Sequence, residues 1–331
     1  MGLTNGVEIN PPTGSTPRPF QRTFLVVIVV TYFPEVDRLL NQIGALIPQS
    51  HHIVIVDNTP DFWDKSSFSP YRERLSWLNL SQNFGLAFGL NRGIDRAIDL
   101  GASHVLLMDQ DSLPSLTMVD DLMSGMLSHP MQESIAAVGP NFVDARGVEF
   151  KPFWMIGFPR SKVLLIRPDD SLIPTDFLIT SGCLIRMEAL QKIGKMDESL
   201  FIDNVDLEWC LRAKSHGWVL VGVRNAYLSH QLGDAHVPAP WFSRLLGKKF
   251  VVRHNATRLY YIMRNRILLY KMPHVPLAWK AQDVLRIPWK FLISVAIAPD
   301  RLRVAVAMLQ GILHGAWGIC GKRPEPLNRD D

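Results

Sequence analysis

The sequence predicts an α/β fold with a mostly parallel sheet flanked by helices, followed by a basic, amphipathic helical extension. Three observations support this prediction. Short β-branched runs end at acidic residues, segments with helical spacing alternate with them, and the last quarter of the chain changes in charge. Because parallel sheets bind ligands beyond the carboxyl ends of their strands, the acids at those ends are the first candidates for a functional site.

The composition is that of a globular protein at the apolar end of the range. The chain has 331 residues, of which 47% are hydrophobic, and this is enough for one catalytic domain with an appendage. Its three cysteines, Cys183, Cys210 and Cys320, are widely spaced. They predict neither a disulfide framework nor a zinc cluster, and they favour a reducing compartment.

Residues 1–22 are expected to form a disordered tail, because prolines, glycines and small polar residues dominate them and they lack the features of a signal peptide. The catalytic α/β domain is expected over residues 23–240. It opens with a strand at 24–30 and a helix over 35–47. Two further strands are predicted at 52–57, which ends at Asp57, and at 75–80.

The glycine-rich segment 83–93 follows the third strand and leads into a helix that ends near Leu100. It does not match the dinucleotide fingerprint, so a dehydrogenase is disfavoured. Its glycines could bring backbone N–H groups close to a phosphate or sugar, or they could simply make a tight turn. The remaining predicted elements are strands at 105–111, 136–140, 162–166, 177–180, 218–223 and 226–230, and a short helix over 186–193.

The fourth strand delivers two carboxylates to the edge of the sheet. Side chains alternate along a strand, so Asp109 and Asp111 lie on the same side if the strand continues through Gln110. Two neighbouring carboxylates repel each other unless a cation joins them, and such oxygen ligands suit Mg²⁺ or Mn²⁺ beside a nucleotide. The alternative is a solvated acidic turn, since a short motif depends on its context.

A second group of acids lies in the segment 201–212. Asp206 is three residues beyond Asp203 and could lie beside it at the start of a helix. Asp203 and Glu208 could equally be helix-capping acids. His230 closes an apolar strand, where a metal-ligand role gains weight against the more common structural one.

The charge is divided unevenly along the chain. Residues 1–240 hold 19 Lys and Arg against 26 Asp and Glu, whereas residues 241–331 hold 16 against 5. In the basic part, apolar segments are interleaved with the charges, and this pattern favours a membrane surface over nucleic acid. No apolar run reaches the roughly 20 residues needed to span a bilayer, so we expect peripheral attachment of 241–331 to an anionic surface.

The last predicted helix, over 300–317, has an apolar stripe. The stripe could pack on the core or lie in a membrane interface, and the basic charge of the region favours the second. Its members are Leu302, Val306, Leu309, Leu313 and Trp317.

From 24 to 230, the chain resembles the inverting glycosyltransferases of family 2, nucleotide-sugar enzymes with a GT-A fold. The parts that match stand in the family's order: Thr31-Tyr32 after the first strand, Asp57, the Asn83 to Gly93 segment, Asp109-Gln110-Asp111 and the Asp206 region. Within the family, four segments look most like bacterial rhamnosyltransferases that use dTDP-L-rhamnose. These are 109–112, 181–184, 201–206 and 258–265.

The resemblance implies roles for individual residues. Asp57 would contact the nucleotide base, Asp109 the ribose or the metal, and Asp111 would be the principal carboxylate ligand, with His230 a further one. Asn83, Gly85 and Asn91 belong to the donor-binding segment. Asp206 falls where the family places its catalytic base, although the acid that usually precedes the base is Val205 here.

We therefore expect a metal-dependent enzyme that transfers L-rhamnose, with inversion, to a lipid-linked saccharide or glycolipid in surface polysaccharide synthesis. It would act at the cytoplasmic face of a bacterial inner membrane, with Mg²⁺ or Mn²⁺ as cofactor and without a nucleic-acid partner. Three alternatives remain: an enzyme that forms rhamnolipids, a family 2 transferase for another sugar, and a non-catalytic membrane protein that binds nucleotide sugars or glycans.

Overall fold

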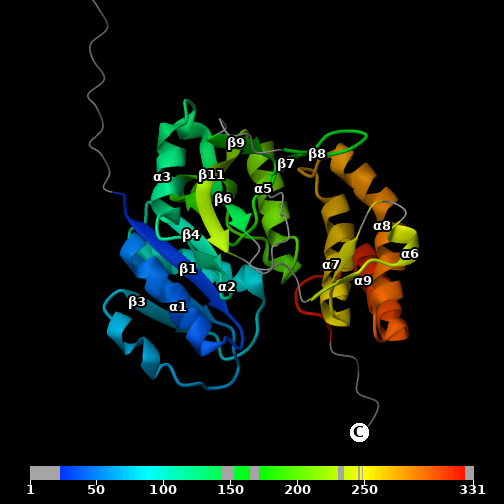
Figure 1. Ribbon diagram of the computed structural model, residues 1–331, viewed down its shortest axis with the longest axis horizontal. Coiled ribbons are helices and arrows are strands. Elements are labelled where there is room, and N and C mark those ends of the chain that lie inside the picture. Colours follow the sequence, from blue (N-terminus) through cyan, green and yellow to red (C-terminus); the bar gives the residue numbers. More distant parts are fainter. Residues whose placement is uncertain are drawn as a thin grey trace, which may run out of the picture.

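The computed structural model describes residues 23–143, 153–164, 171–229, 235–244, 247 and 249–324. A nine-stranded sheet with helices on both faces forms one part of the molecule, and helices from the C-terminal region lie beside it (Figure 1). The predicted α/β fold is confirmed. The predicted disordered tail, residues 1–22, lies outside the described residues.

Four parallel strands form the first half of the sheet. In spatial order they are β3 (Leu75–Asn79), β2 (His52–Asp57), β1 (Leu25–Thr31) and β4 (His104–Asp109). All seven residues of β1 are buried, because helices cover both faces of the strand. On one face lies α1 (Val36–Leu46) and on the other α2 (Leu86–Asp99).

The second half of the sheet is mixed. From β4 the order continues through β10 (Cys183–Arg186), β6 (Ile135–Val143), β11 (Val219–Ser229) and β5 (Leu113–Pro114), and β9 (Leu172–Thr175) pairs with β11. Strand β10 is antiparallel to both neighbours, whereas β6 and β11 are parallel to each other. Three helices accompany this half: α3 (Met118–Ser128), α4 (Met187–Ile193) and α5 (Val205–Ser215).

Some details of the predicted strands are wrong. The described parts of the segments 218–223 and 226–230 fall in a single strand, β11 (Val219–Ser229), whose pairing with β6 shifts register between Val223 and Tyr227. The segment 177–180 is not a strand, because Leu178 packs into the core under Gly139 and its backbone N–H donates to the Cys210 sulfur instead of a ladder partner. The predicted strand at 162–166 extends in part beyond the described residues.

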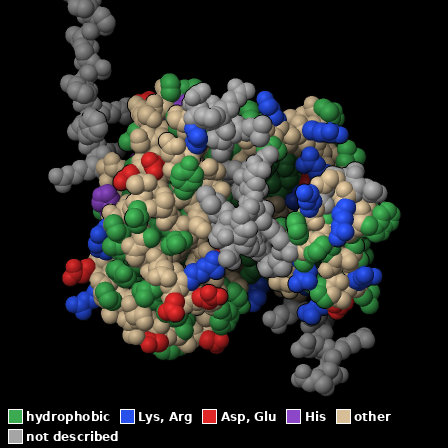
Figure 2. Space-filling view, in the orientation of Figure 1, with side chains coloured by type: hydrophobic (Ala, Val, Ile, Leu, Met, Phe, Trp, Pro, Cys, Tyr) green, Lys and Arg blue, Asp and Glu red, His purple; other side chains and the backbone are tan. Residues whose placement is uncertain are grey.

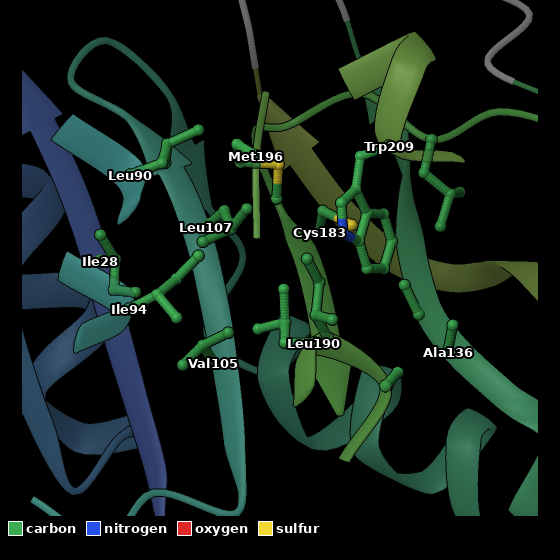
Figure 3. Packing of buried hydrophobic residues seen from close by; sticks show 14 of the residues in the cluster. Ile28, Leu90, Ile94, Val105, Leu107, Ala136, Cys183, Leu190, Met196 and Trp209 are labelled. Atoms are coloured by element: carbon green, nitrogen blue, oxygen red, sulfur yellow. The ribbon is translucent and has the colours of Figure 1, made fainter. Parts of the chain in front are cut away.

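The larger hydrophobic core lies on the α2 face of the sheet and reaches α4 and α5 (Figure 3). Trp209 of α5 is buried there near Cys183, and its indole N–H donates to the Gly194 carbonyl at 3.0 Å. Cys183 and Cys210 are both buried free thiols, and burial raises their pKa values. Within the described residues the expectation that cysteines form no disulfide framework is confirmed.

Short elements connect these units. The strands are β7 (Trp154–Met155), β8 (Lys162–Val163), β12 (Ala235–Pro238) and β13 (Phe250–Arg253), the helix is α6 (Trp241–Arg244), and the 3-10 helices are η1 (Ile47–Gln49), η2 (Ser66–Tyr71), η3 (Gln132–Ser134) and η4 (Glu198–Leu200).

Three long helices follow: α7 (Ala256–Lys271), α8 (Leu277–Ile297) and α9 (Arg301–Trp317). Helix α9 turns its small residues toward α7. A Cβ atom added at Gly311 would lie 2.4 Å from the Tyr260 carbonyl oxygen, and one at Gly315 would lie 2.6 Å from that of Arg264. This close approach fixes the rotation of α9, so the predicted stripe from Leu302 to Trp317 faces away from α7 and all five of its residues are exposed. Among the described residues, we find no helix with both the length and the apolar character needed to cross a bilayer.

The contact between α9 and α7 predicts the effect of Gly311→Ala. Although alanine favours a helix, its methyl group would overlap a backbone carbonyl, so we expect the free energy of unfolding to fall by about 1 to 3 kcal/mol. Gly44→Ala on α1 is the matched control, since its methyl group would meet only the Tyr71 hydroxyl at 3.4 Å. Chemical denaturation should show that Gly44→Ala is neutral or stabilising by up to about 1 kcal/mol. Equal stability of the two variants would contradict the packing of α9.

Candidate active site

An open pocket of about 450 Å³ lies where several elements meet at the carboxyl ends of β1 and β4. The end of β1 contributes Val30 to Tyr32, and the end of β4 contributes Asp109 to Asp111. The remaining lining comes from the end of β2, the segment before β10, the starts of α2 and α5 with the loops before them, and the first turn of α7. These residues are Asn58, Asn83, Gly85, Leu86, Ile179, Thr180, Phe201 to Asp206 and Arg258.

Asp109 and Asp111 both line the pocket, although β4 ends at Asp109 and a turn at Gln110 and Asp111 replaces the continued strand that the predicted alternation required. Burial raises the pKa of Asp109 to about 7, the negative charge of Asp111 adds to this effect, and the Arg258 guanidinium opposes it. Between the two acids, the Gln110 side chain accepts a hydrogen bond from the Tyr32 backbone N–H at 2.7 Å and donates to the Tyr32 carbonyl at 3.2 Å. The acidic turn is therefore tied to the end of β1.

Asp206 lies in the first turn of α5 and faces the same pocket. Burial raises its pKa to about 7, and the charges of Asp109 and Asp203 also raise it, whereas the hydrogen bond donated by the Leu207 backbone N–H, at 2.8 Å, lowers it. The effect of Asp109 on the pKa of Asp206 shows that the two predicted groups of acids, far apart in sequence, interact electrostatically.

The loop before Asp206 has an unusual backbone. Phe201, Asp203 and Asn204 all have positive φ, at 62°, 64° and 59°. Residues with a side chain adopt this region at a cost of about 1 to 3 kcal/mol each, so the surrounding structure must hold them there. Asn204 is the N-cap of α5, so Asp203 stands one residue before the capping position.

The C-terminal region supplies the contacts that hold this loop. The fully buried Asn265 of α7 donates from its side-chain amide to the carbonyls of Leu200, Ile202 and Asp203 at 2.9, 2.7 and 2.8 Å. Arg264, also fully buried, donates to the Leu200 carbonyl at 2.9 Å and, through Nε, to the Asn265 side-chain oxygen at 2.9 Å. These two side chains thereby fix the backbone that carries Asp203 and leads to Asp206.

Sequence reasoning gave no role to Arg258, Arg264 or Asn265. Arg258 pairs with Asp203 inside the pocket, with Nε 3.1 Å from the carboxylate oxygen. The segment 258–265 contributes to the resemblance to rhamnosyltransferases, and its adjacent polar residues Arg264 and Asn265, both buried in the structure, are the signal for a contact beyond helix packing.

In the glycine-rich segment, Asn83 and Gly85 both line the pocket. Gly85 has a φ of 94°, and a Cβ atom there would lie 2.6 Å from the Phe201 carbonyl oxygen. Asn58 closes the turn, since its side chain accepts from the Phe84 backbone N–H and donates to the Gly85 carbonyl. The glycine therefore allows α2 to begin directly against the loop that carries Asp203.

Two other predicted donor-binding residues do not line the pocket. The buried carboxylate of Asp57 pairs with Lys65 at 2.8 Å and accepts from Trp63 at 2.7 Å; although burial alone would raise its pKa, these partners lower it. The Asn91 side chain is buried and bonds to both the N–H and the carbonyl of Met196 at 2.9 Å. Both residues fix the surroundings of the pocket in this structure.

Glu208 is explained by a contact within the protein. It is buried and forms an ion pair with Arg212, with Nε 2.8 Å from its carboxylate, while the His274 ring lies 2.9 Å from the same oxygen. It faces away from the pocket lining, so Asp206 is the helix-start acid that is open to a ligand.

A divalent cation fits the chemistry of Asp109 and Asp111. Their oxygens are hard donors, and a cation between them would relieve the repulsion that contributes to the raised pKa of Asp109. Within the described part of the chain, no three His, Cys, Asp or Glu side chains are grouped as a metal site. His230, the predicted further ligand, lies outside the described residues.

No family model matches the chain. The sequence is 27% identical to the dTDP-rhamnosyl transferase RfbF of Shigella flexneri, over 90% of this chain and 97% of that protein. It is 25% identical to the galactofuranosyltransferase GlfT1 of Mycolicibacterium smegmatis, over 82% of this chain and 91% of that protein.

Solved structures share the fold. TarS 1-349 of S. aureus in complex with UDP-GlcNAc has a TM-score of 0.56 at 14% identity, with 90% of this chain and 82% of that chain covered. GalNAc-T7 with UDP, GalNAc and Mn²⁺ has a TM-score of 0.55 at 12% identity, covering 89% of this chain and 56% of that chain. The chain therefore has the GT-A fold of nucleotide-sugar glycosyltransferases, and its sequence is similar to that of a dTDP-rhamnosyl transferase over 90% of its length.

Proposed function

We propose that the protein transfers L-rhamnose from dTDP-L-rhamnose, with inversion, to a hydroxyl of a lipid-linked glycan or glycolipid used for a bacterial surface polysaccharide. The observation that carries this proposal is the similarity to the dTDP-rhamnosyl transferase, because it extends over nearly the whole of both chains. The pocket supports it with two acidic groups that can have different tasks.

Asp206 is the proposed general base. A sugar hydroxyl is a weak nucleophile, so a carboxylate must take its proton as the oxygen attacks the anomeric carbon. A pKa near 7 makes Asp206 a stronger base than an ordinary carboxylate while leaving it largely ionised above neutral pH. The proton leaves the acceptor hydroxyl and bonds to the Asp206 oxygen as the bond between the sugar and the nucleotide diphosphate breaks.

Asp109 and Asp111 are the proposed ligands for Mg²⁺ or Mn²⁺ beside the donor diphosphate. A bound cation would stabilise the negative charge of the leaving diphosphate. The pocket is also lined by Asn83, Gly85 and Arg258, which can bind polar groups of the donor. His230 remains a proposed ligand, the contact of Asp57 with the nucleotide base remains a proposal, and so does the donor-binding role of Asn91.

One observation favours a second donor sugar. The galactofuranosyltransferase relative is nearly as similar in percentage identity, though over less of the chain. A screen of nucleotide sugars, read as acceptor-dependent release of the nucleotide diphosphate, separates the two donors. The rhamnosyl proposal requires the highest kcat/KM with dTDP-L-rhamnose.

The C-terminal region, 241–331, is the proposed membrane-associating part, at the cytoplasmic face of the inner membrane. The stripe on α9 is apolar and exposed, and basic residues such as Arg301 and Arg303 stand at its start. On the face drawn in Figure 2, Lys and Arg side chains are interspersed with hydrophobic ones over the right-hand part, where Figure 1 places α6 and α8. Apolar burial combined with anionic attraction is how a protein binds a lipid surface without crossing it.

The base assignment predicts the behaviour of Asp206→Asn. We expect kcat to fall by about 10²- to 10⁴-fold while the dissociation constant for dTDP-L-rhamnose stays nearly the same, because the amide cannot accept the proton. In the wild type, kcat/KM should rise with pH and level off above about 7 as Asp206 and its neighbour Asp109 lose their protons. Asp120→Asn, an exposed acid on α3, is the control. Near-normal transfer by Asp206→Asn would show that another group is the base.

The raised pKa of Asp109 predicts that this residue destabilises the fold at high pH. A carboxyl whose pKa is higher in the folded state than in the unfolded state costs stability once both states are ionised. The free energy of unfolding of Asp109→Asn should therefore equal that of the wild type below about pH 4. The difference should grow as the pH rises through 7 and reach on the order of 1 to 4 kcal/mol in favour of Asp109→Asn at pH 8.

The proposed cation site is tested by adding Mn²⁺ to the wild type and to Asp109→Asn and comparing their Tm values. At pH 8, Mn²⁺ should raise the Tm of the wild type and have little effect on Asp109→Asn, and EDTA should reverse the effect. Calorimetry without any substrate is sufficient for this measurement. An equal response of both proteins to Mn²⁺ would place the ion elsewhere.

Membrane attachment through α9 predicts the outcome of flotation with vesicles of phosphatidylglycerol and phosphatidylcholine. Replacing Leu309 and Leu313 by serine should reduce the floated fraction, as should high salt, because apolar burial and charge both contribute. The control replaces Leu116 and Leu127, which are similarly exposed on the α/β part. If both double variants float like the wild type, the stripe does not bind the bilayer.

A further inference from the structure

Among the described residues, several cavities border the beginning of α7, including one of about 720 Å³ that has Thr257 and Lys322 in its wall. Three others lie next to consecutive residues of this helix. The first is the candidate active site, lined there by Arg258. The second, of about 450 Å³, lies between the junction of β13 with α7 and the start of α9, and Thr257 is in its wall. The third, of about 540 Å³, lies between β13, α7 and α8, and Leu259 is in its wall. Three consecutive residues of one helical turn therefore point toward three neighbouring cavities.

The second cavity is positively charged. Arg253 and Arg303 line it with His254. Among the residues that the structure describes, no ion pair involves the guanidinium of Arg253 or Arg303. The one acid in the wall, Asp300, accepts a hydrogen bond from the Arg303 backbone N–H at 2.9 Å. Two guanidinium groups beside one acid favour an anionic ligand such as a phosphate.

The third cavity is an apolar groove that shares His254 with the second. Two cationic residues in its wall, Arg266 and Lys290, share the single carboxylate of Asp283, so an excess positive charge remains there as well. Its volume is that of a pocket for a small organic ligand. The apolar lining consists of Phe250, Val251, Val252, Leu259, Ile262, Met263 and Ile293.

We propose that these two cavities bind the phosphate and the apolar chain of a lipid-phosphate-linked acceptor, with the phosphate between Arg253 and Arg303 and the chain in the groove. The arrangement matches such a molecule: an apolar chain, an anionic group next to it, and a saccharide that extends past Thr257 toward Arg258 and the pocket of Asp206. The inference rests on the proposed transfer to a lipid-linked acceptor and adds the place where the lipid is held.

Charge and position together select this occupant. A free phosphate would use the second cavity and leave the apolar groove exposed to water, which is unfavourable for its seven hydrophobic lining residues. A neutral chain would use the groove and leave the charge of Arg253 and Arg303 without a partner. A single amphiphile with a phosphate satisfies both cavities.

The test measures binding of farnesyl phosphate to the full chain by titration calorimetry, with inorganic phosphate and farnesol as separate arms. We expect one farnesyl phosphate to bind saturably, at least about tenfold tighter than inorganic phosphate or farnesol. Inorganic phosphate lacks the apolar contact and farnesol lacks the charged one. Ser294→Trp, which fills the groove, should weaken this binding by about tenfold or more, as should Arg253→Glu combined with Arg303→Glu.

Arg72→Glu is the matched control, because Arg72 is exposed on the α/β part and lines neither cavity. The Tm and the affinity for dTDP, which binds at the first pocket, show whether each variant is folded. The inference would be overturned if farnesyl phosphate bound no tighter than inorganic phosphate. It would also be overturned if the folded groove-filling variant, the folded charge-reversed variant and the control all bound farnesyl phosphate equally well. Binding as expected in a protein that transfers no sugar would reject the proposed function and retain the lipid site.

Discussion

The side-chain amide of Asn265 is the contact on which the candidate active site depends. It bonds to three carbonyls of the loop from Leu200 to Asp203, and Arg264 holds both the amide and the loop. Because Phe201 and Asp203 in that loop and Asn204 directly after it have positive φ, its shape is not the one it would adopt alone. The start of α5, and with it Asp206, is therefore placed by a helix that lies outside the sheet.

The second constraint is electrostatic. Folding brings Asp109, Asp111, Asp203 and Asp206 to one pocket, where burial and mutual repulsion raise the pKa values of Asp109 and Asp206 to about 7. This arrangement costs stability and prepares the pocket for a positively charged ligand on one side and a proton on the other. The division into a cation side and a base side follows from the elements involved, since Asp109 ends a strand, Asp111 lies in the turn after it and Asp206 begins a helix.

The sequence was sufficient to predict the parts of the fold that follow from local patterns. The buried runs ending at Asp57 and Asp109 and the spacing of the α9 stripe are periodic, and the structure has the strands and the helix at these positions. Contacts between distant segments could not be read from such patterns. Asn265 bonds to a loop that is 62 to 65 residues away in sequence. The Asp57 carboxylate bonds to Trp63 and Lys65, and Leu178, in a predicted strand, packs against Gly139 instead.

The central claim is that one carboxylate, Asp206, activates the acceptor for a single displacement at the anomeric carbon. The measurement that tests it most directly is the anomeric configuration of the product formed from dTDP-L-rhamnose, determined by NMR from the one-bond carbon–hydrogen coupling. A configuration opposite to that of the donor is the result expected from a single displacement. Retention of the donor configuration would require a different chemical path and would contradict the account.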